Sequence, residues 1–404
     1  MSHSRHGTAA SIAVRECVAA HDLDAAWRIR ALAFGESPTP EEAWTAGGWR
    51  GWVAELDGRV CGFARAWPYR QFFGGRAVPM AGLASVAVDP YARGHGVASA
   101  MLDALLPALR EQGQPLSALY PSVTELYRAR GWEHVGVYEW VEVPLLTLRS
   151  VPPPAREVEL RPAVDADLPA LHDCYLRFAS SVDGLLDRRG PAFEPWRLLE
   201  LDVVTVASGG PAGSDSPRGY VAAARGEQGL VVYDLVAHDP DALRALLRSL
   251  ASWAGQLSTV RLRLLQPRAL LPVALGTDVF AEQWMLRVVD LPAAVAARGW
   301  PRAALLPPGL AVDIEVVDEH APWHAGPHRL VVEHDGSGAG GVVVERGGSG
   351  AVRLTARGLA AWYAGSASSV ALRRAGLLDG DPAAAAVLDA LTATPGPPRL
   401  GNAF

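Results

Sequence analysis

The sequence predicts a mixed α/β protein of several domains, two of which are copies of one fold. Apolar runs typical of strands alternate with helical patterns along the chain. The pattern near the N-terminus returns at residues 160–171, as expected of a tandem repeat. Proline-rich segments at residues 151–154 and 300–309 divide the 404 residues into three blocks, each of a usual domain size. We expect domains at residues 1–150, 155–298 and 302–404.

The first block is expected to run in the order strand, helix, hairpin, strand, helix, strand and helix. After a strand at residues 14–18, Asp22 and Asp24 offer caps for a helix, because their side chains can accept early N–H bonds. Asp57 and Gly58 separate two alternating runs, which is a strong hairpin signal. The remaining elements are expected as a strand at 82–88, a helix after 96, a strand at 116–120 and a short helix that reaches 127.

The second block repeats this order but lacks one motif. Strands are expected at residues 219–224 and 230–236, with a helix after them. No glycine-rich loop joins that strand to that helix, so the second copy is expected to keep the fold without a ligand site. The third block joins strands by Gly-rich turns and ends in two apolar helices. The strands are expected at 313–317, 329–333, 342–345 and 351–354, and the helices at 356–363 and 382–391.

Composition excludes several classes of protein. The chain has 37 basic residues, all of them arginine, and 43 acidic residues. The resulting net charge of −6 argues against nucleic acid as a partner and fits a cationic substrate. Cys17, Cys61 and Cys174 have no metal-ligand spacing, so we expect no metal, no disulfide framework and a cytoplasmic protein. Neither a signal peptide nor a membrane-spanning run of roughly 20 apolar residues is expected.

Residues 86–98 contain the most informative motif of the chain. An apolar run is followed by a turn with Pro90, by an Arg-x-x-Gly-x-Ala loop and by the start of a helix. Free N–H groups and the positive end of the helix dipole meet there, which suits an anion such as a diphosphate. Gly94 and Gly96 permit positive φ and a close approach of the main chain. The segment lacks the Gly-x-Gly-x-x-Gly of a dinucleotide site and the Gly-Lys-Ser/Thr of a P-loop.

This segment resembles the acyl-CoA signature of the GCN5-related N-acetyltransferases (GNAT), which place Arg/Gln-x-x-Gly-x-Gly/Ala after a strand. Arg93, Gly96 and Ala98 match that pattern. The resemblance implies tandem GNAT-type domains and acetyl-CoA as co-substrate. The loop would hold the diphosphate, and the main chain of the preceding strand would pair with the pantetheine arm. The residues that the resemblance assigns to the cofactor are Val86, Ala87, Val88, Arg93, Gly94, His95, Gly96, Val97, Ala98, Ser99, Ser122 and Val123.

Tyr127 is the candidate general acid. It lies in residues 126–132, which resemble the Tyr-x-x-x-Gly-Phe/Trp pattern that follows the last cofactor-contacting strand in this superfamily. A phenol with a reference pKa of about 10 is protonated at neutral pH and can donate its proton to a departing thiolate. The alternative is a tyrosine that packs on the cofactor without taking part in catalysis.

The complete chain resembles the Eis (enhanced intracellular survival) family of aminoglycoside N-acetyltransferases, in which a domain similar to sterol carrier protein follows two GNAT-type domains. Residues 355–365 resemble that third fold. In the family the α-carboxylate of the last residue reaches the first active site and acts as general base, which gives this role to Phe404. Family members can carry an acid before that residue, whereas this chain has Ala403, so amine affinity or regiochemistry is expected to differ. The family assembles as hexamers, which implies a homohexamer here.

By the same resemblance, the acceptor is a cationic small-molecule amine, such as an aminoglycoside or similar polyamine, with several amines acetylated in succession. An acidic cleft lined by aromatic rings would suit such a cation. The candidates before the hairpin, each of which also fits a plain surface position, are Asp24, Trp27, Glu36, Glu41, Glu42 and Trp44. Two alternatives remain open: acetylation of protein lysines or natural polyamines, and a lipid or sterol carrier with a vestigial transferase.

Overall fold

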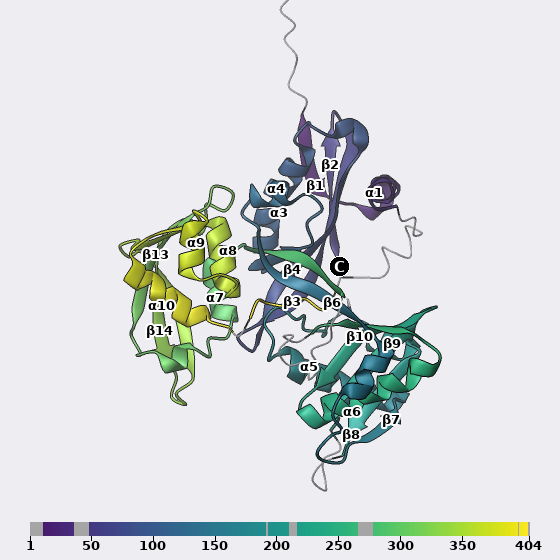
Figure 1. Cartoon of the computed structure of the whole chain (residues 1–404). Helices are drawn as coiled ribbons and strands as arrows, with labels where there is room; N and C mark the ends of the chain where they lie inside the picture. Colours follow the sequence, from purple (N-terminus) through teal and green to yellow (C-terminus); the bar gives the residue numbers. More distant parts are fainter. Residues whose placement is uncertain are drawn as a thin grey trace, which may run out of the picture.

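The computed structural model describes residues 11–35, 48–190, 193–209, 216–265, 278–394 and 396–402. Figure 1 shows three blocks: the first at the top in purple and blue, the second at the lower right in teal, and the third at the left in green and yellow. The mixed α/β fold predicted from the sequence is confirmed. No helix within these residues is long and apolar enough to cross a membrane.

The first block has the expected order of elements, followed by one strand, β6, that sequence analysis missed. Asp57 and Gly58 adopt φ values of 52° and 79°, so the predicted hairpin closes through two left-handed residues. The first helix begins earlier than expected, at Ala19, and Asp22 lies inside its first turn, where the carboxylate accepts the Val18 N–H at 2.7 Å. The elements are β1 (Ile12–Glu16), α1 (Ala19–Phe34), β2 (Arg50–Leu56), β3 (Arg59–Phe73), β4 (Arg76–Val88), α3 (Val97–Glu111), β5 (Leu116–Leu119), α4 (Thr124–Arg128) and β6 (Glu133–Pro144).

The second block repeats the first down to individual side chains. In the first copy the Arg15 guanidinium binds the Asp22 carboxylate at 2.6 Å, at the start of the first helix. In the second copy Arg161 binds Asp167 at 2.6 Å, immediately before the corresponding helix. The elements are β7 (Glu159–Pro162), α5 (Leu168–Ala179), β8 (Val203–Ser208), β9 (Gly219–Arg225), β10 (Gly229–Ala237), α6 (Pro240–Leu250), β11 (Thr259–Arg263) and β12 (Asp278–Val288).

Strands are exchanged between the two copies. Within the described residues, twelve strands form one sheet in the order β1-β2-β3-β4-β5-β12-β6-β11-β10-β9-β8-β7. β12 inserts between β5 and β6 and pairs antiparallel with both, while β6 pairs with β11 of the second copy. The last strand of the second copy therefore completes the sheet of the first. Sequence analysis predicted neither this exchange nor the strands β6, β11 and β12 that take part in it.

The described residues of the third block form a separate five-stranded sheet, in the order β15-β14-β13-β16-β17. Sequence analysis predicted four of these strands and missed β17, α7 and α9. α7 precedes the expected boundary of this block. Its Ala294 carbonyl nevertheless accepts a hydrogen bond of 3.0 Å from the hydroxyl of Tyr363, which belongs to the third block. The division of the chain at residues 150 and 302 thus remains a prediction. The elements are α7 (Leu291–Ala297), β13 (Ala311–Val317), β14 (Gly326–His334), β15 (Gly340–Arg346), β16 (Val352–Thr355), α8 (Ala356–Ala364), α9 (Ser369–Arg374), β17 (Leu378–Gly380) and α10 (Pro382–Thr392).

A buried carboxylate connects the third block to α4 of the first. Glu133 binds Arg128 at 2.7 Å and Arg357 of α8 at 2.5 Å. Burial raises the pKa of Glu133, but hydrogen bonds from Arg128, His134 and Arg357 outweigh it and hold the pKa below its ordinary value. The carboxylate is therefore ionised at neutral pH, and it fixes the end of α4 against the third block.

Candidate functional site

β4 and β5 diverge at the centre of the first block. Their parallel pairing involves only residues 80–82 of β4, although that strand continues to Val88. β3 pairs with the other edge of β4 along this stretch. No described strand covers the open edge beyond Gly82. Residues 86–88, predicted from the sequence to pair with a pantetheine arm, lie on this edge, where an extended ligand can pair with unpaired backbone groups.

A β-bulge interrupts β4 within this open stretch. Phe63 of β3 lies opposite Ala87, whereas Arg65 lies opposite Ala84, so β4 contains one extra residue between them. Ser85 in the bulge has a φ of 55°, a value that costs a non-glycine residue some backbone strain. Sequence analysis missed the bulge, since a serine in an apolar run is only a weak signal for it.

The glycine loop, residues 93–99, connects this strand to α3. Gly94 and Gly96 have φ values of 80° and 83°, and an added Cβ at either would meet no atom of the described residues within 4 Å. Glycine is thus favoured there by its backbone conformation and not by lack of space. Arg93 is exposed, and its Nε lies 3.4 Å from the Val88 carbonyl oxygen. The nitrogen Nδ1 of His95 lies 3.1 Å from the Arg93 carbonyl oxygen.

No described side chain caps the N-terminus of α3. Gly96 is the N-cap, and the first hydrogen bond of the helix runs from the Ala100 N–H to the Gly96 carbonyl at 2.9 Å. The amides of Val97, Ala98 and Ser99 precede that bond and lie at the positive end of the helix dipole. The residues that sequence analysis selected for a diphosphate are therefore brought together at one helix end that can bind an anion.

The corresponding helix of the second copy is blocked by its own carboxylates. Asp239 caps α6 and accepts the N–H groups of Asp241 and Ala242, each at 3.0 Å. Arg218 binds the same carboxylate at 2.7 Å. The hydrogen bond from Arg218 is the main reason why the pKa of Asp239 lies below its ordinary value. An anionic ligand would find these two N–H groups already bonded to the Asp239 carboxylate, whereas the start of α3 has no such side-chain bond.

Tyr127 lies in α4 and is only 5% exposed. It shares a hydrophobic cluster with Val97 and Met101 of α3, and its ring meets Trp132 edge-on at 6.3 Å. Burial raises the pKa of its hydroxyl to about 12. No residue of the described part of the chain forms a hydrogen bond with this hydroxyl, which remains available to a ligand. Ser122 and Val123, the weaker predictions for cofactor contact, are exposed at the start of α4.

The C-terminal tail (residues 396–402) lies along β6. The Leu400 N–H donates to the Val137 carbonyl at 3.1 Å, and the Val137 N–H donates to the Pro398 carbonyl at 3.2 Å. Arg399 forms a buried ion pair with Glu139. The Tyr120 hydroxyl, at the end of β5, donates to the Asn402 carbonyl at 2.9 Å. The tail is thus fixed up to Asn402, which lies beside the end of β5, the strand that diverges from β4. Phe404 itself lies outside the described residues.

The predicted acceptor residues are only partly described. Trp27 is 4% exposed and packs against Trp49 and Phe63, with ring centroids 5.8 and 5.7 Å away, and Asp24 is exposed. Arg30 donates to the Ser85 hydroxyl at 3.2 Å. The four other candidates, Glu36, Glu41, Glu42 and Trp44, lie outside the described residues.

Comparison with known proteins agrees with this geometry. A family model of the acetyltransferase (GNAT) domain matches residues 15–135, and one of the sterol carrier protein domain matches residues 291–401. An uncharacterized N-acetyltransferase from Streptomyces avermitilis is 31% identical over 366 residues, which cover 80% of this chain and 82% of the relative.

Among the solved structures that cover nearly the whole chain are one from Kribbella flavida and one from Mycobacterium abscessus. A GCN5-related N-acetyltransferase from Kribbella flavida is 30% identical, with a TM-score of 0.80 over 98% of this chain and 99% of its own. Eis1 from Mycobacterium abscessus, at 24% identity and a TM-score of 0.72, shares the fold over 98% of this chain and 100% of its own. The chain belongs to the GCN5-related N-acetyltransferase family and is an acetyltransferase.

Proposed function

We propose that this acetyltransferase transfers the acetyl group of acetyl-CoA to primary amines of a cationic small molecule, an aminoglycoside or similar polyamine, as the resemblance to the Eis family implies. GNAT acetyltransferases use acetyl-CoA. One observation carries the proposal: an uncapped helix N-terminus directly follows a strand with an open edge. The amides of residues 97–99 and the side chain of Arg93 fit a diphosphate, and the main chain of residues 86–88 fits the amide-bearing pantetheine arm.

The reaction requires two proton transfers, which we assign to Phe404 and Tyr127. As the amine nitrogen attacks the thioester carbonyl carbon, the C–N bond forms and the C–S bond breaks. The Phe404 α-carboxylate accepts the proton that the amine loses, and the Tyr127 hydroxyl donates a proton to the leaving sulfur. Direct transfer in a ternary complex needs no nucleophile from the protein.

Replacing Tyr127 with phenylalanine is expected to lower kcat about 100-fold or more, the usual effect of losing a general acid. The KM for acetyl-CoA should change little, because the ring still fills its place beside Trp132. Since burial raises the pKa of Tyr127 to about 12, the hydroxyl keeps its proton up to about pH 10, and wild-type activity should not fall below that pH through its ionisation. Thiol release measured across this pH range tests both points.

Tyr91→Phe is the matched control, because this exposed tyrosine precedes the glycine loop and its ring packs under Arg59. It should leave kcat unchanged. If Tyr127→Phe retained wild-type kcat, Tyr127 would serve packing only.

The base assignment is supported by the fixed course of the tail. Gly184, with a φ of 98°, lies so close to the tail that an added Cβ would come within 2.5 Å of the Arg399 carbonyl oxygen. Gly184→Ala is therefore expected to displace the tail and to lower kcat about 100-fold, since a misplacement of about 1 Å can cost that much. The KM for acetyl-CoA should be retained, and proteolysis near the C-terminus should be faster.

Gly190→Ala provides the control for backbone strain. Its φ is 132°, and an added Cβ there meets no atom within 4 Å among the residues that the structure describes. If the two variants lost kcat equally, backbone strain would explain the effect. The tail would then have no role in placing the base.

The acceptor class is tested with a panel of amines. Near the predicted acceptor residues, Arg30 lies over the Trp27 ring and Arg65 over the Trp49 ring. Because both side chains are cations, as the substrate is, binding of a polyamine would depend on Asp24 and on the acids of residues 36–47. Mass spectrometry should find several acetyl groups on an aminoglycoside. Faster acetylation of lysine peptides or natural polyamines would support those substrates instead, and no thiol release with any amine would favour a carrier with a vestigial transferase.

The hexamer implied by the resemblance is tested by the native mass.

A further inference from the structure

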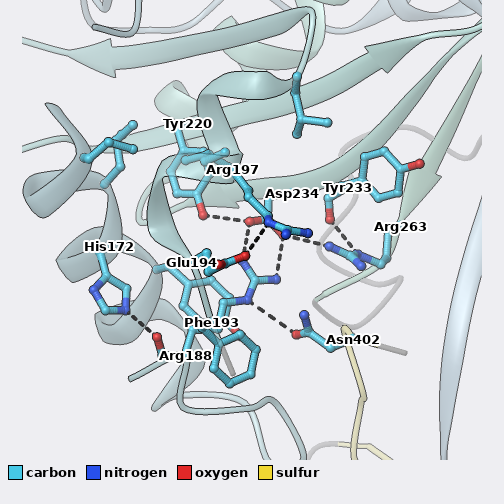
Figure 2. Close-up of a pocket in the computed structure, with 15 residues that line it drawn as sticks. His172, Arg188, Phe193, Glu194, Arg197, Tyr220, Tyr233, Asp234, Arg263 and Asn402 are labelled. Atoms are coloured by element: carbon cyan, nitrogen blue, oxygen red, sulfur yellow. Dashed lines mark hydrogen bonds and ion pairs between the residues drawn. The ribbon is translucent and has the colours of Figure 1, made fainter. Parts of the chain in front are cut away.

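The second copy contains a cavity of about 320 Å³ that the acetyl transfer does not use. Figure 2 shows it between α5, the strands β9 and β10, and a short 3-10 helix, residues 195–200. Asn402 of the tail also lines it. In the first copy, the corresponding place is the face between α1 and the strands β3 and β4. The second copy thus lacks an open helix end at α6 but has a cavity at this place.

A cluster of buried charges lies on the wall of this cavity. Asp234 accepts two hydrogen bonds from Arg188, at 2.5 and 2.9 Å, and one from Arg263 at 3.0 Å. The Tyr220 hydroxyl donates to the same carboxylate at 2.9 Å. The Arg188 guanidinium also stacks on the Tyr175 ring, 3.8 Å from its centroid. Each of these groups is held in place by the others, so the cluster is preorganised.

The cluster carries one positive charge in excess. Two guanidiniums share the single carboxylate of Asp234, which is 2% exposed, while Arg263 is 8% exposed. The other ionic residues of the wall, Arg197 and Glu194, form an ion pair with each other. Burying an unbalanced charge is costly, and an anion that enters the cavity lowers this cost.

One guanidinium still has a donor for such an anion. Arg263 donates through Nε to the Tyr233 carbonyl at 2.6 Å and through Nη2 to Asp234. No described residue accepts a hydrogen bond from its Nη1. A carboxylate in the cavity would receive a charge-assisted hydrogen bond from this group, which is stronger than a bond between neutral partners.

The remaining wall is apolar and selects the body of the ligand. Leu168, Leu171, Leu198 and Phe193 line it. A cavity with apolar walls and a few converging polar groups is typical of a small-molecule site. We propose that this cavity binds a small monocarboxylate with an apolar or aromatic body, whose carboxylate contacts Arg263. Asn402 connects the site to the tail, because its side-chain oxygen lies 3.4 Å from the Nε of Arg188.

The test measures binding directly, without acetyl transfer, so its outcome is independent of the proposed function. The full chain, saturated with CoA, is titrated with 4-fluorobenzoate and separately with 4-fluorobenzamide, and both are followed by ¹⁹F NMR. We expect saturable binding of the benzoate, at least about tenfold tighter than that of the neutral amide. Equal affinity of the two probes, or no saturable binding of the benzoate to the wild type, overturns the proposal.

Variants locate the binding. Arg263→Gln leaves Asp234 with its two bonds from Arg188, so the fold is expected to persist while benzoate affinity falls at least about tenfold. Arg261→Gln on the same strand is the matched control, since Arg261 is exposed and stacks on Trp140. Leu198→Trp narrows the cavity without a change of charge and should also weaken binding. Wild-type affinity in both Arg263→Gln and Leu198→Trp would place the probe elsewhere and refute the assignment.

Discussion

Replacing Ala98 with aspartate is expected to raise the KM for acetyl-CoA at least about 100-fold while leaving the melting temperature unchanged or slightly higher. Ala98 is the second residue of α3, where a carboxylate is favourable for the helix dipole. The same carboxylate would fill and repel the place of the diphosphate. A hydrogen bond to a charged group contributes roughly 1.5–3 kcal/mol, and about 1.4 kcal/mol is tenfold in affinity, so the loss of two such bonds accounts for the effect.

The second copy provides the precedent for this variant. Asp241 holds the same position in α6, where its carboxylate accepts the Ala155 N–H at 2.8 Å and binds Arg156 at 3.0 Å. Ala98→Asn is the control, because it adds nearly the same volume without the charge and should raise KM far less. If aspartate left the affinity for CoA unchanged by calorimetry, the diphosphate would have to bind away from this helix end.

The features predicted correctly from the sequence are those with local causes. The hairpin at Asp57 and Gly58 and the loop at Gly94 and Gly96 depend on backbone conformations that a few neighbouring residues determine. The expectation that the second copy lacks a ligand site, which rests on residues 238–244, stays a prediction, and the Asp239 cap supports it.

The features that could not be predicted depend on contacts between distant parts of the chain. The insertion of β12 between β5 and β6 pairs Met285 with Leu119, and no local pattern distinguishes it from pairing within the second copy. Tyr120 was predicted only as the end of a strand. Its hydroxyl donates a hydrogen bond to the carbonyl of Asn402, 282 residues further along the chain. The bulge at Ser85 likewise depends on the register between β3 and β4.

Adding one glycine after Phe404 is expected to lower kcat about 100-fold or more, with little change in the KM for acetyl-CoA or in the melting temperature. The tail is fixed through Leu400 and Asn402, so an extra residue moves the terminal carboxylate without releasing the segment before it. Deletion of Phe404 should be equally harmful, since the chain would then end one residue too early. Phe404→Ala keeps the carboxylate at its position and loses only the ring, so its kcat should fall much less.

The comparison of these three variants separates the carboxylate from the aromatic ring. An α-carboxyl has a reference pKa of about 3.5, which makes it a weak base in water, and burial near the active site would raise that pKa toward the value a base needs. The acid limb of the kcat profile should therefore report this group in the wild type and in Phe404→Ala, and it should shift or vanish in the extended chain. Equal losses of kcat in all three variants, with one common pH profile, would exclude the carboxylate as the base and leave the ring as the functional end of the tail.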